Sequence, residues 1–90
     1  MHTITIPRQL RRFSNQTIEH LSSEDTLEGI YRELIALYPK LLGPMFTAEG
    51  KLQYFVGVFI DGKPPTLVSK KEVILKNDAE IVFINAVAGG

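Results

Sequence analysis

The sequence predicts an α+β fold in which one helix packs against one face of a mixed β-sheet. Three observations support this prediction. Two short segments near the start alternate polar and apolar residues, as half-buried strands do. One long central stretch has apolar residues at helical spacing, and further strand-like segments follow it.

The first of these segments is predicted to be a strand over residues 3–6, which Pro7 ends. Residues 9–15 are mainly polar and basic, and they are predicted to form a loop. A second alternation over residues 18–21 is predicted to be the other arm of an antiparallel pair.

The helix has the clearest signal in the sequence. Asp25 can cap its first turn, and Glu28, three residues later, can complete a capping box. Pro39 ends it, because the residue before a proline disfavours the helical region. Gly29 inside the helix costs roughly 1 kcal/mol relative to alanine, so tertiary packing must offset that loss. The stripe predicted to face the core is Leu27, Ile30, Tyr31, Leu34, Ile35, Leu37 and Tyr38.

A long loop is predicted over residues 40–51, where two glycine-containing turn signals flank an apolar pair. A strand rich in β-branched and aromatic residues follows over residues 52–60, and Asp61-Gly62 then marks a turn. Short apolar stretches later in the chain indicate small strands or a connecting turn.

The last strand is predicted over residues 80–85, after a turn in which Asn77 suits a left-handed backbone position. If the first and last strands lie side by side at the centre of the sheet, the arrangement is the β-grasp, or ubiquitin-like, fold, with four to five strands on one main helix. We expect one domain over residues 1–84 and a flexible tail over residues 85–90.

The composition excludes several classes of function. Lys+Arg and Asp+Glu each total 10, so net charge gives no attraction to nucleic acid or to an anionic membrane. The chain has no cysteine, which excludes a disulfide scaffold and a cysteine nucleophile. No apolar run approaches the ~18 residues of a membrane span. We therefore expect a cytoplasmic protein with neither nucleic acid nor a membrane as partner.

Candidate catalytic and metal-binding groups are sparse. His2 and His20 fall in the predicted first hairpin without carboxylate or cysteine support, so no metal site is predicted. No Ser/His/Asp set or carboxylate pair recurs at a recognisable spacing, and intrinsic catalysis is not expected.

The tail is the strongest chemical feature. Its residues Val87, Ala88, Gly89 and Gly90 are small and uncharged, and glycine lets a backbone pass through a narrow channel. A partner's active site could therefore enclose the terminal carboxylate. A carboxylate is a poor electrophile and needs activation, most simply by adenylation with ATP. The chain lacks a phosphate-binding glycine loop, so we expect no bound cofactor and an ATP-using partner.

The whole chain resembles the MoaD/ThiS group of ubiquitin-like sulfur carriers. Each matching stretch is short, but together they run in the same order over essentially the full length. They are Thr3-Ile4-Thr5-Ile6-Pro7, Asp25-Thr26-Leu27, Gly50-Lys51-Leu52, Phe55-Val56 and Asn85-Ala86-Val87-Ala88-Gly89-Gly90.

This resemblance implies that an E1-like enzyme adenylates Gly90 and that a sulfur donor converts the product to a thiocarboxylate. The thiocarboxylate is then delivered to an acceptor biosynthetic enzyme, with Gly89, Ala88 and Val87 as the thread that reaches the reaction centre. The longer loop before Gly50 favours the carriers of cysteine biosynthesis. The small subunit of molybdopterin synthase and a ubiquitin-like protein modifier remain alternatives.

A docking surface is predicted on the sheet. Phe55, Phe59, Val82 and Ile84 fall on strand faces opposite the predicted core positions, and they would form an exposed apolar patch for the E1-like enzyme or the acceptor. The alternatives are that the faces are inverted or that the long loop covers these residues. Basic residues at Arg8, Arg11 and Arg12 could contact an acidic partner surface or simply be solvated.

Overall fold

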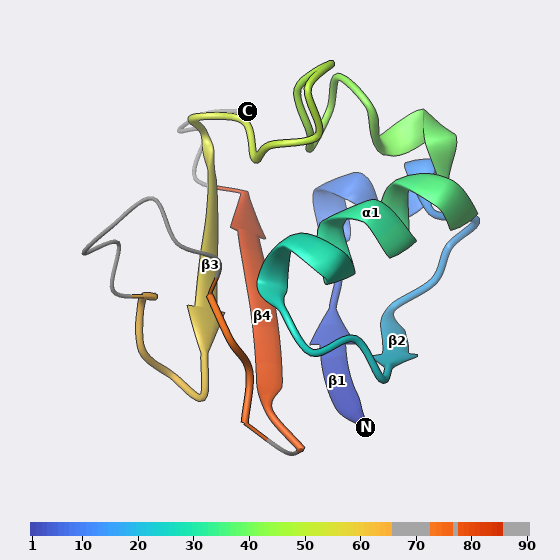
Figure 1. Cartoon of the computed structure of the whole chain (residues 1–90). Helices are drawn as coiled ribbons and strands as arrows, with labels where there is room; N and C mark the ends of the chain where they lie inside the picture. Colours follow the sequence, from blue (N-terminus) through green and yellow to red (C-terminus); the bar gives the residue numbers. More distant parts are fainter. Residues whose placement is uncertain (66–72, 77, 86–90) are drawn as a thin grey trace.

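The computed structural model describes residues 1–65, 73–76 and 78–85 (Figure 1). They form a mixed four-stranded sheet in the order β2-β1-β4-β3, with α1 across one face. β1 runs parallel to β4 and antiparallel to β2, and β3 runs antiparallel to β4. The elements are β1 (His2–Thr5), η1 (Arg8–Phe13), β2 (Glu19–Ser22), α1 (Leu27–Leu37), η2 (Pro39–Leu41), β3 (Val56–Ile60) and β4 (Glu80–Asn85).

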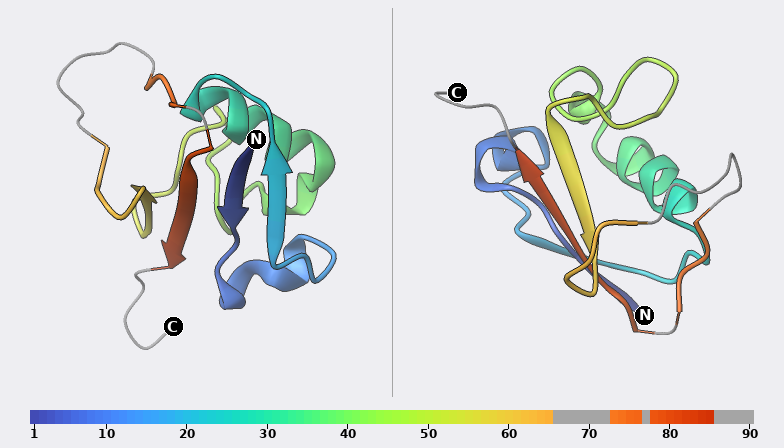
Figure 2. Two further views of the ribbon diagram at one scale, coloured as in Figure 1. Left: turned by 90° about the horizontal axis from the view of Figure 1, so that it is seen from below. Right: turned by 90° about the vertical axis from the view of Figure 1, so that its left-hand side faces the viewer.

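The first and last strands are therefore neighbours at the centre of the sheet, which confirms the predicted β-grasp fold. The right-hand view of Figure 2 shows α1 on one side of β3 and β4 only. One face of the sheet is thus covered by the helix, and the other is not.

Two predicted loops contain 3₁₀ helix. The first is η1, within the segment predicted as a loop over residues 9–15. Pro7 precedes it with φ −58° and accepts a hydrogen bond from the Leu10 N–H at 2.9 Å. Residues three apart lie on the same side of a 3₁₀ helix, so Leu10 is buried while Phe13 packs partly against the core. The second is the short η2, which extends to Leu41 at the start of the long loop.

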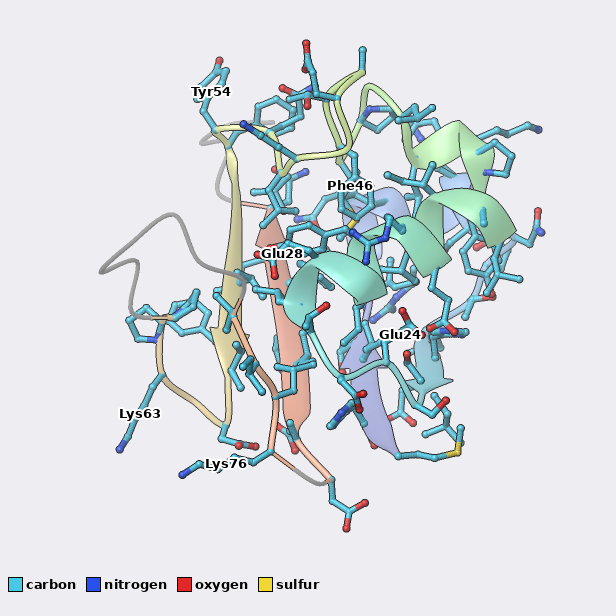
Figure 3. The ribbon with its side chains drawn as sticks, viewed as in Figure 1. Glu24, Glu28, Phe46, Tyr54, Lys63 and Lys76 are labelled. Atoms are coloured by element: carbon cyan, nitrogen blue, oxygen red, sulfur yellow. The ribbon has the colours of Figure 1, made fainter. Side chains whose placement is uncertain are left out.

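The core lies between α1 and the covered face of the sheet. Ile4, Ile81 and Phe83 are buried on the strands, and the ring of Tyr31 on α1 packs 6.0 Å from that of Phe83. The long loop contributes Phe46, whose ring centre lies 5.3 Å from Tyr31 (Figure 3). Its burial explains why the loop lies against the domain.

One residue of the predicted helical stripe does not face the core. Leu37 is half exposed, whereas Leu27, Ile30 and Leu34 are buried. At ~100° per residue, Leu37 lies about 50° from the mean direction of these three residues, at the edge of the stripe. It is also the last residue of α1, so its side chain lies at the margin of the packed layer.

The helix begins one residue later than the capping prediction. Thr26 is the N-cap, and its Oγ1 accepts a hydrogen bond from the Gly29 N–H at 3.0 Å. Glu28 does not close a capping box, because its Oε1 accepts from the Val73 N–H at 3.0 Å. The Asp25 carbonyl accepts from the Leu75 N–H at 2.8 Å. The cap therefore also fixes residues 73–75 against the start of the helix.

The contacts around this cap explain why glycine occupies position 29 in the first turn of α1. A Cβ on Gly29 would lie 2.5 Å from Glu24 Oε1 and 3.0 Å from Thr26 Oγ1. Glu24 and Glu28 both lie close to this turn in Figure 3. The crowding leaves no room for a larger residue unless Glu24 moves.

The turn after β3 has the predicted geometry. Asp61 and Gly62 both have positive φ, at 51° and 81°. Ile60 and Lys63 exchange both backbone hydrogen bonds across the turn, at 2.7 and 3.0 Å, as in a two-residue type I′ hairpin. The predicted left-handed Asn77 lies outside the described residues, and its neighbour Asp78 has φ 54°.

Candidate functional site

The tail follows β4, one of the two central strands of the sheet. β4 is paired on both sides, and its Ile81 and Phe83 are buried. It reaches Asn85, which pairs with Val56 of β3 and lies one residue beyond the predicted domain boundary. The strand therefore fixes the point from which the tail departs.

The four tail residues with predicted chemical roles lie outside the described residues. These are Val87, Ala88, Gly89 and Gly90. Their roles remain predictions, and the structure defines only the strand that precedes them.

Three of the predicted docking residues share the face of the sheet opposite α1. Phe59 pairs directly with Val82, and Ile84 pairs with Gly57. Ile84 is 43% exposed, and Phe59 and Val82 are half-buried between their neighbours. We call Gly57, Phe59, Val82 and Ile84 the open face. Within the described residues no helix covers its apolar side chains, which are partly or largely accessible there.

Phe55 does not belong to the open face. It lies in the turn just before β3 and packs partly against the core. Its ring makes an edge contact with Tyr54, with 5.2 Å between ring centres. The predicted alternation placed it with Phe59, but the strand starts only at Val56, so the alternation does not extend to this residue.

Basic residues lie at the same end of the sheet as the base of the tail. β1 is parallel to β4, with Thr5 beside Val82, so η1 follows β1 where β4 also ends. Arg11 Nε donates to the Ile6 carbonyl at 3.1 Å, and the Arg12 guanidinium lies 4.8 Å from the centre of the Phe13 ring. The sequence reasoning did not connect this segment with the tail, although a parallel pairing of the first and last strands brings them together.

Both histidines contact neighbouring structural groups. The buried His2 accepts a hydrogen bond at Nδ1 from the Ala79 N–H at 3.0 Å. His20 Nε2 lies 3.1 Å from Glu33 Oε2 on α1. Among residues 1–65, 73–76 and 78–85, no three metal-ligating side chains come together. No helix in this part of the chain is long and apolar enough to cross a bilayer.

Two side chains have shifted pKa values. Burial, and then the nearby Glu28 carboxylate, raise the pKa of the Tyr31 hydroxyl well above its ordinary value of 10.0. The Met1 ammonium lowers the pKa of the Asp78 carboxyl, first by a hydrogen bond and then by its charge. Asp78 lies just before β4, at the opposite end of the strand from Asn85.

A sequence model of the family described as the ThiS family matches residues 4–90. The chain belongs to the ThiS family. The predicted resemblance to MoaD/ThiS-like carriers is thereby confirmed. No curated protein matches the sequence significantly.

Solved structures support the same fold for this ThiS-family chain. A structure of the Amycolatopsis orientalis BexX/CysO complex has a chain with TM-score 0.82 and 21% identity, and the match covers 100% of both chains. The small archaeal modifier protein 1 (SAMP1) of Methanosarcina acetivorans gives TM-score 0.80 and 22% identity, over 99% of this chain and 95% of that one. Mycobacterium tuberculosis CysO gives TM-score 0.74 and 23% identity, over 97% and 100%. The chain therefore has the ubiquitin-like fold of CysO and SAMP1.

Proposed function

We propose that this ThiS-family chain is a sulfur carrier whose terminal Gly90 is activated as an adenylate and converted to a thiocarboxylate. The observation that carries the proposal is the family match, which extends from residue 4 through Gly90. The geometry supports it, because the tail follows a central strand whose buried Ile81 and Phe83 hold its base in place.

The chemistry requires two steps on the Gly90 carbonyl. In the first, a carboxylate oxygen attacks the α-phosphorus of ATP, and pyrophosphate leaves. In the second, a sulfide equivalent attacks the carbonyl carbon of the acyl-adenylate, and AMP leaves with the C–O bond electrons. An E1-like partner supplies the ATP site, so the chain acts as a co-substrate and not as an enzyme.

The acceptor that we favour is a biosynthetic enzyme of cysteine formation in the cytoplasm. The support is the structural likeness to two proteins named CysO, one of them in a complex with BexX. The alternative is that this chain is itself the small subunit of molybdopterin synthase, since the tail of such a subunit would look the same.

A second candidate function is protein modification. The likeness to SAMP1, which is named a small archaeal modifier protein, favours it. In that case a lysine amine of a target protein would attack the activated Gly90 carbonyl in place of sulfide, and an isopeptide bond would form.

Intact-mass measurement distinguishes these functions. The chain is produced together with its E1-like enzyme, and a carrier is expected to show replacement of one oxygen by sulfur. Deleting Gly90 should abolish the change, whereas the exposed-site control Lys40→Ala should keep it. An unchanged mass in the presence of ATP and a sulfur source contradicts the carrier proposal. Conjugates on denaturing gels that require Gly90 would instead support the modifier.

We also propose that the open face docks the E1-like enzyme or the acceptor. Gly57 offers a clean test, because nothing lies within 4 Å of a Cβ placed there. A Gly57→Arg variant should fold normally and bind the activating enzyme at least about tenfold more weakly, since it places a charge in an apolar contact. Titration calorimetry measures this.

The matched control is Leu21→Arg. Leu21 is exposed on the same side of the sheet, but it lies on β2 at the opposite edge from β3. If both variants lost the same binding affinity, or if Gly57→Arg lost none, docking through the open face would be contradicted.

A further inference from the structure

Tyr54 is an exposed aromatic residue at the end of the sheet from which the tail departs. It is 96% exposed, and its ring makes an edge contact with Phe55. Figure 3 shows its side chain projecting beyond the end of β3. Apolar surface stabilises a fold only when it is removed from water, so this ring contributes little to the stability of the domain.

The turn that carries Tyr54 is fixed to the domain by hydrogen bonds. The Val56 N–H donates to the Gln53 carbonyl at 3.0 Å and closes a β-turn of which Tyr54 is the second residue. The Gln53 N–H donates to the Met45 carbonyl at 3.0 Å, and its side-chain Nε2 donates to the Gly43 carbonyl at 3.0 Å. A ring on a fixed backbone loses little conformational freedom when it binds. The turn is therefore suited to contact with another protein.

This turn lies within the reach of the tail. Val56, two residues after Tyr54, pairs with Asn85, the last residue of β4. Paired Cα atoms lie at most about 5.5 Å apart, and two residues span at most about 7 Å, so the Cα atoms of Tyr54 and Asn85 lie within about 13 Å of each other. Residues 86–90 span at most about 18 Å when fully extended. An enzyme that encloses the Gly90 carbonyl must therefore approach the surface that carries Tyr54.

The charges near Tyr54 favour neither an acidic nor a basic partner. The exposed Glu49 and Lys51 lie on the same loop and have opposite charges. What the turn offers is the apolar ring and its hydroxyl group. Tyrosine is enriched among the residues that contribute most to binding at interfaces, because it buries a large apolar area and can still form a hydrogen bond. The surface that fits it is an apolar cleft with one polar group at its base.

We propose that Tyr54 anchors the chain to the enzyme that activates Gly90, by inserting into an apolar cleft beside the entrance of that enzyme's catalytic cavity. This inference rests on the proposed function, since it takes the activating enzyme as the partner that encloses Gly90. Tyr54 is a positioning residue: it holds the domain against the enzyme and does not touch the reacting atoms. It lies outside the open face and adds a second region of contact.

Titration calorimetry of the full chain against its E1-like enzyme tests this contact. Tyr54→Ala should weaken binding at least about tenfold, and Tyr54→Phe, which keeps the ring, should recover most of the affinity. The matched control is Ile74→Ala, which should leave binding unchanged. Ile74 is 79% exposed and lies beside Ile60 and Lys63, at the other end of β3. Because both positions are exposed, the midpoints of urea unfolding should match that of the parent chain.

ATP–pyrophosphate exchange separates this contact from the carrier chemistry. Tyr54→Ala should raise the KM for the chain about tenfold and leave kcat unchanged, because the ring does not touch the reacting atoms. Exchange with equal KM for the parent and Tyr54→Ala would overturn the Tyr54 contact and leave the proposed function intact. Binding that depends on Tyr54 but gives no exchange would support the contact and contradict the proposed function.

Three further results would overturn the contact. They are equal losses of affinity in Tyr54→Ala and Ile74→Ala, no recovery of affinity in Tyr54→Phe, or a fall in kcat without a change in KM. The last result would place Tyr54 at the chemical step and not at the entrance of the cavity.

Discussion

The two faces of the sheet are both apolar but differ in what covers them. On the covered face, Ile81 and Phe83 are buried beneath α1. On the open face of the same strand, Val82 is half-buried and Ile84 is 43% exposed. Successive residues of one strand thus have opposite environments.

This difference separates residues that stabilise the fold from residues that remain accessible at its surface. Burying apolar area stabilises the fold by roughly 25 cal/mol per Å², so the covered residues carry most of that contribution. Residues of the open face bury less area within the domain. They can therefore be changed with little cost to folding.

The largest effect is expected from the covered face. Phe83→Ala removes a buried ring that packs against Tyr31 and leaves a cavity. Replacements of this kind cost about 3–5 kcal/mol of unfolding free energy, which is a large part of the stability of a small domain. Urea denaturation followed by circular dichroism measures the loss.

Ile84→Ala is the matched control one residue along β4. Because Ile84 keeps 43% of its surface exposed and lies outside the core, its truncation should change the unfolding free energy by no more than about 1 kcal/mol. Similar losses for Phe83→Ala and Ile84→Ala would show that the open face also contributes to the core, and the comparison would fail.

A smaller effect is expected where α1 is fixed over the covered face. Thr26→Ala removes the side chain that accepts the Gly29 N–H, and it should cost about 1 kcal/mol. Asp25→Ala is the control, since Asp25 contributes its main-chain carbonyl and not a side-chain cap. Thermal unfolding of both variants checks the assignment. If Asp25→Ala lost more stability than Thr26→Ala, the N-cap would be Asp25, as the sequence predicts.

The position of the N-cap of α1 shows what local sequence rules can and cannot predict. The rules identified a helix, its end at Pro39 and most of its buried stripe, because helical spacing and proline chemistry are local. They chose Asp25 over Thr26, because Glu28 stands three residues after Asp25. In the structure Glu28 holds Val73, which is distant in the sequence. A contact of that range leaves no local signal.

The candidate site was predictable in part for the same reason. Strand alternation placed Phe59, Val82 and Ile84 on one face, and the pairing of β3 with β4 brings them together. Alternation failed for Phe55, because it cannot locate the residue at which a strand begins. An apolar pocket between α1 and β3, lined in part by Leu27, Val56 and Val58, was not predicted, since it depends on how the helix packs over the strand.

The smallest effect is on the pH dependence of the unfolding free energy, and it appears only at alkaline pH. It tests whether water is excluded from the Tyr31 hydroxyl between α1 and the sheet. The folded chain holds the Tyr31 proton to higher pH than the unfolded chain, whose phenol titrates near its ordinary pKa of 10.0. Above that pH the unfolded state binds fewer protons, so the free energy of unfolding falls as pH rises. Tyr31→Phe keeps the ring against Phe46 and Phe83 and removes the phenol. Its stability should match the parent at neutral pH and fall less steeply above pH ~10, as measured by urea denaturation across that range. Parallel pH profiles for the two proteins would mean that water reaches the Tyr31 hydroxyl freely, and that the layer between α1 and the sheet is not sealed at this side.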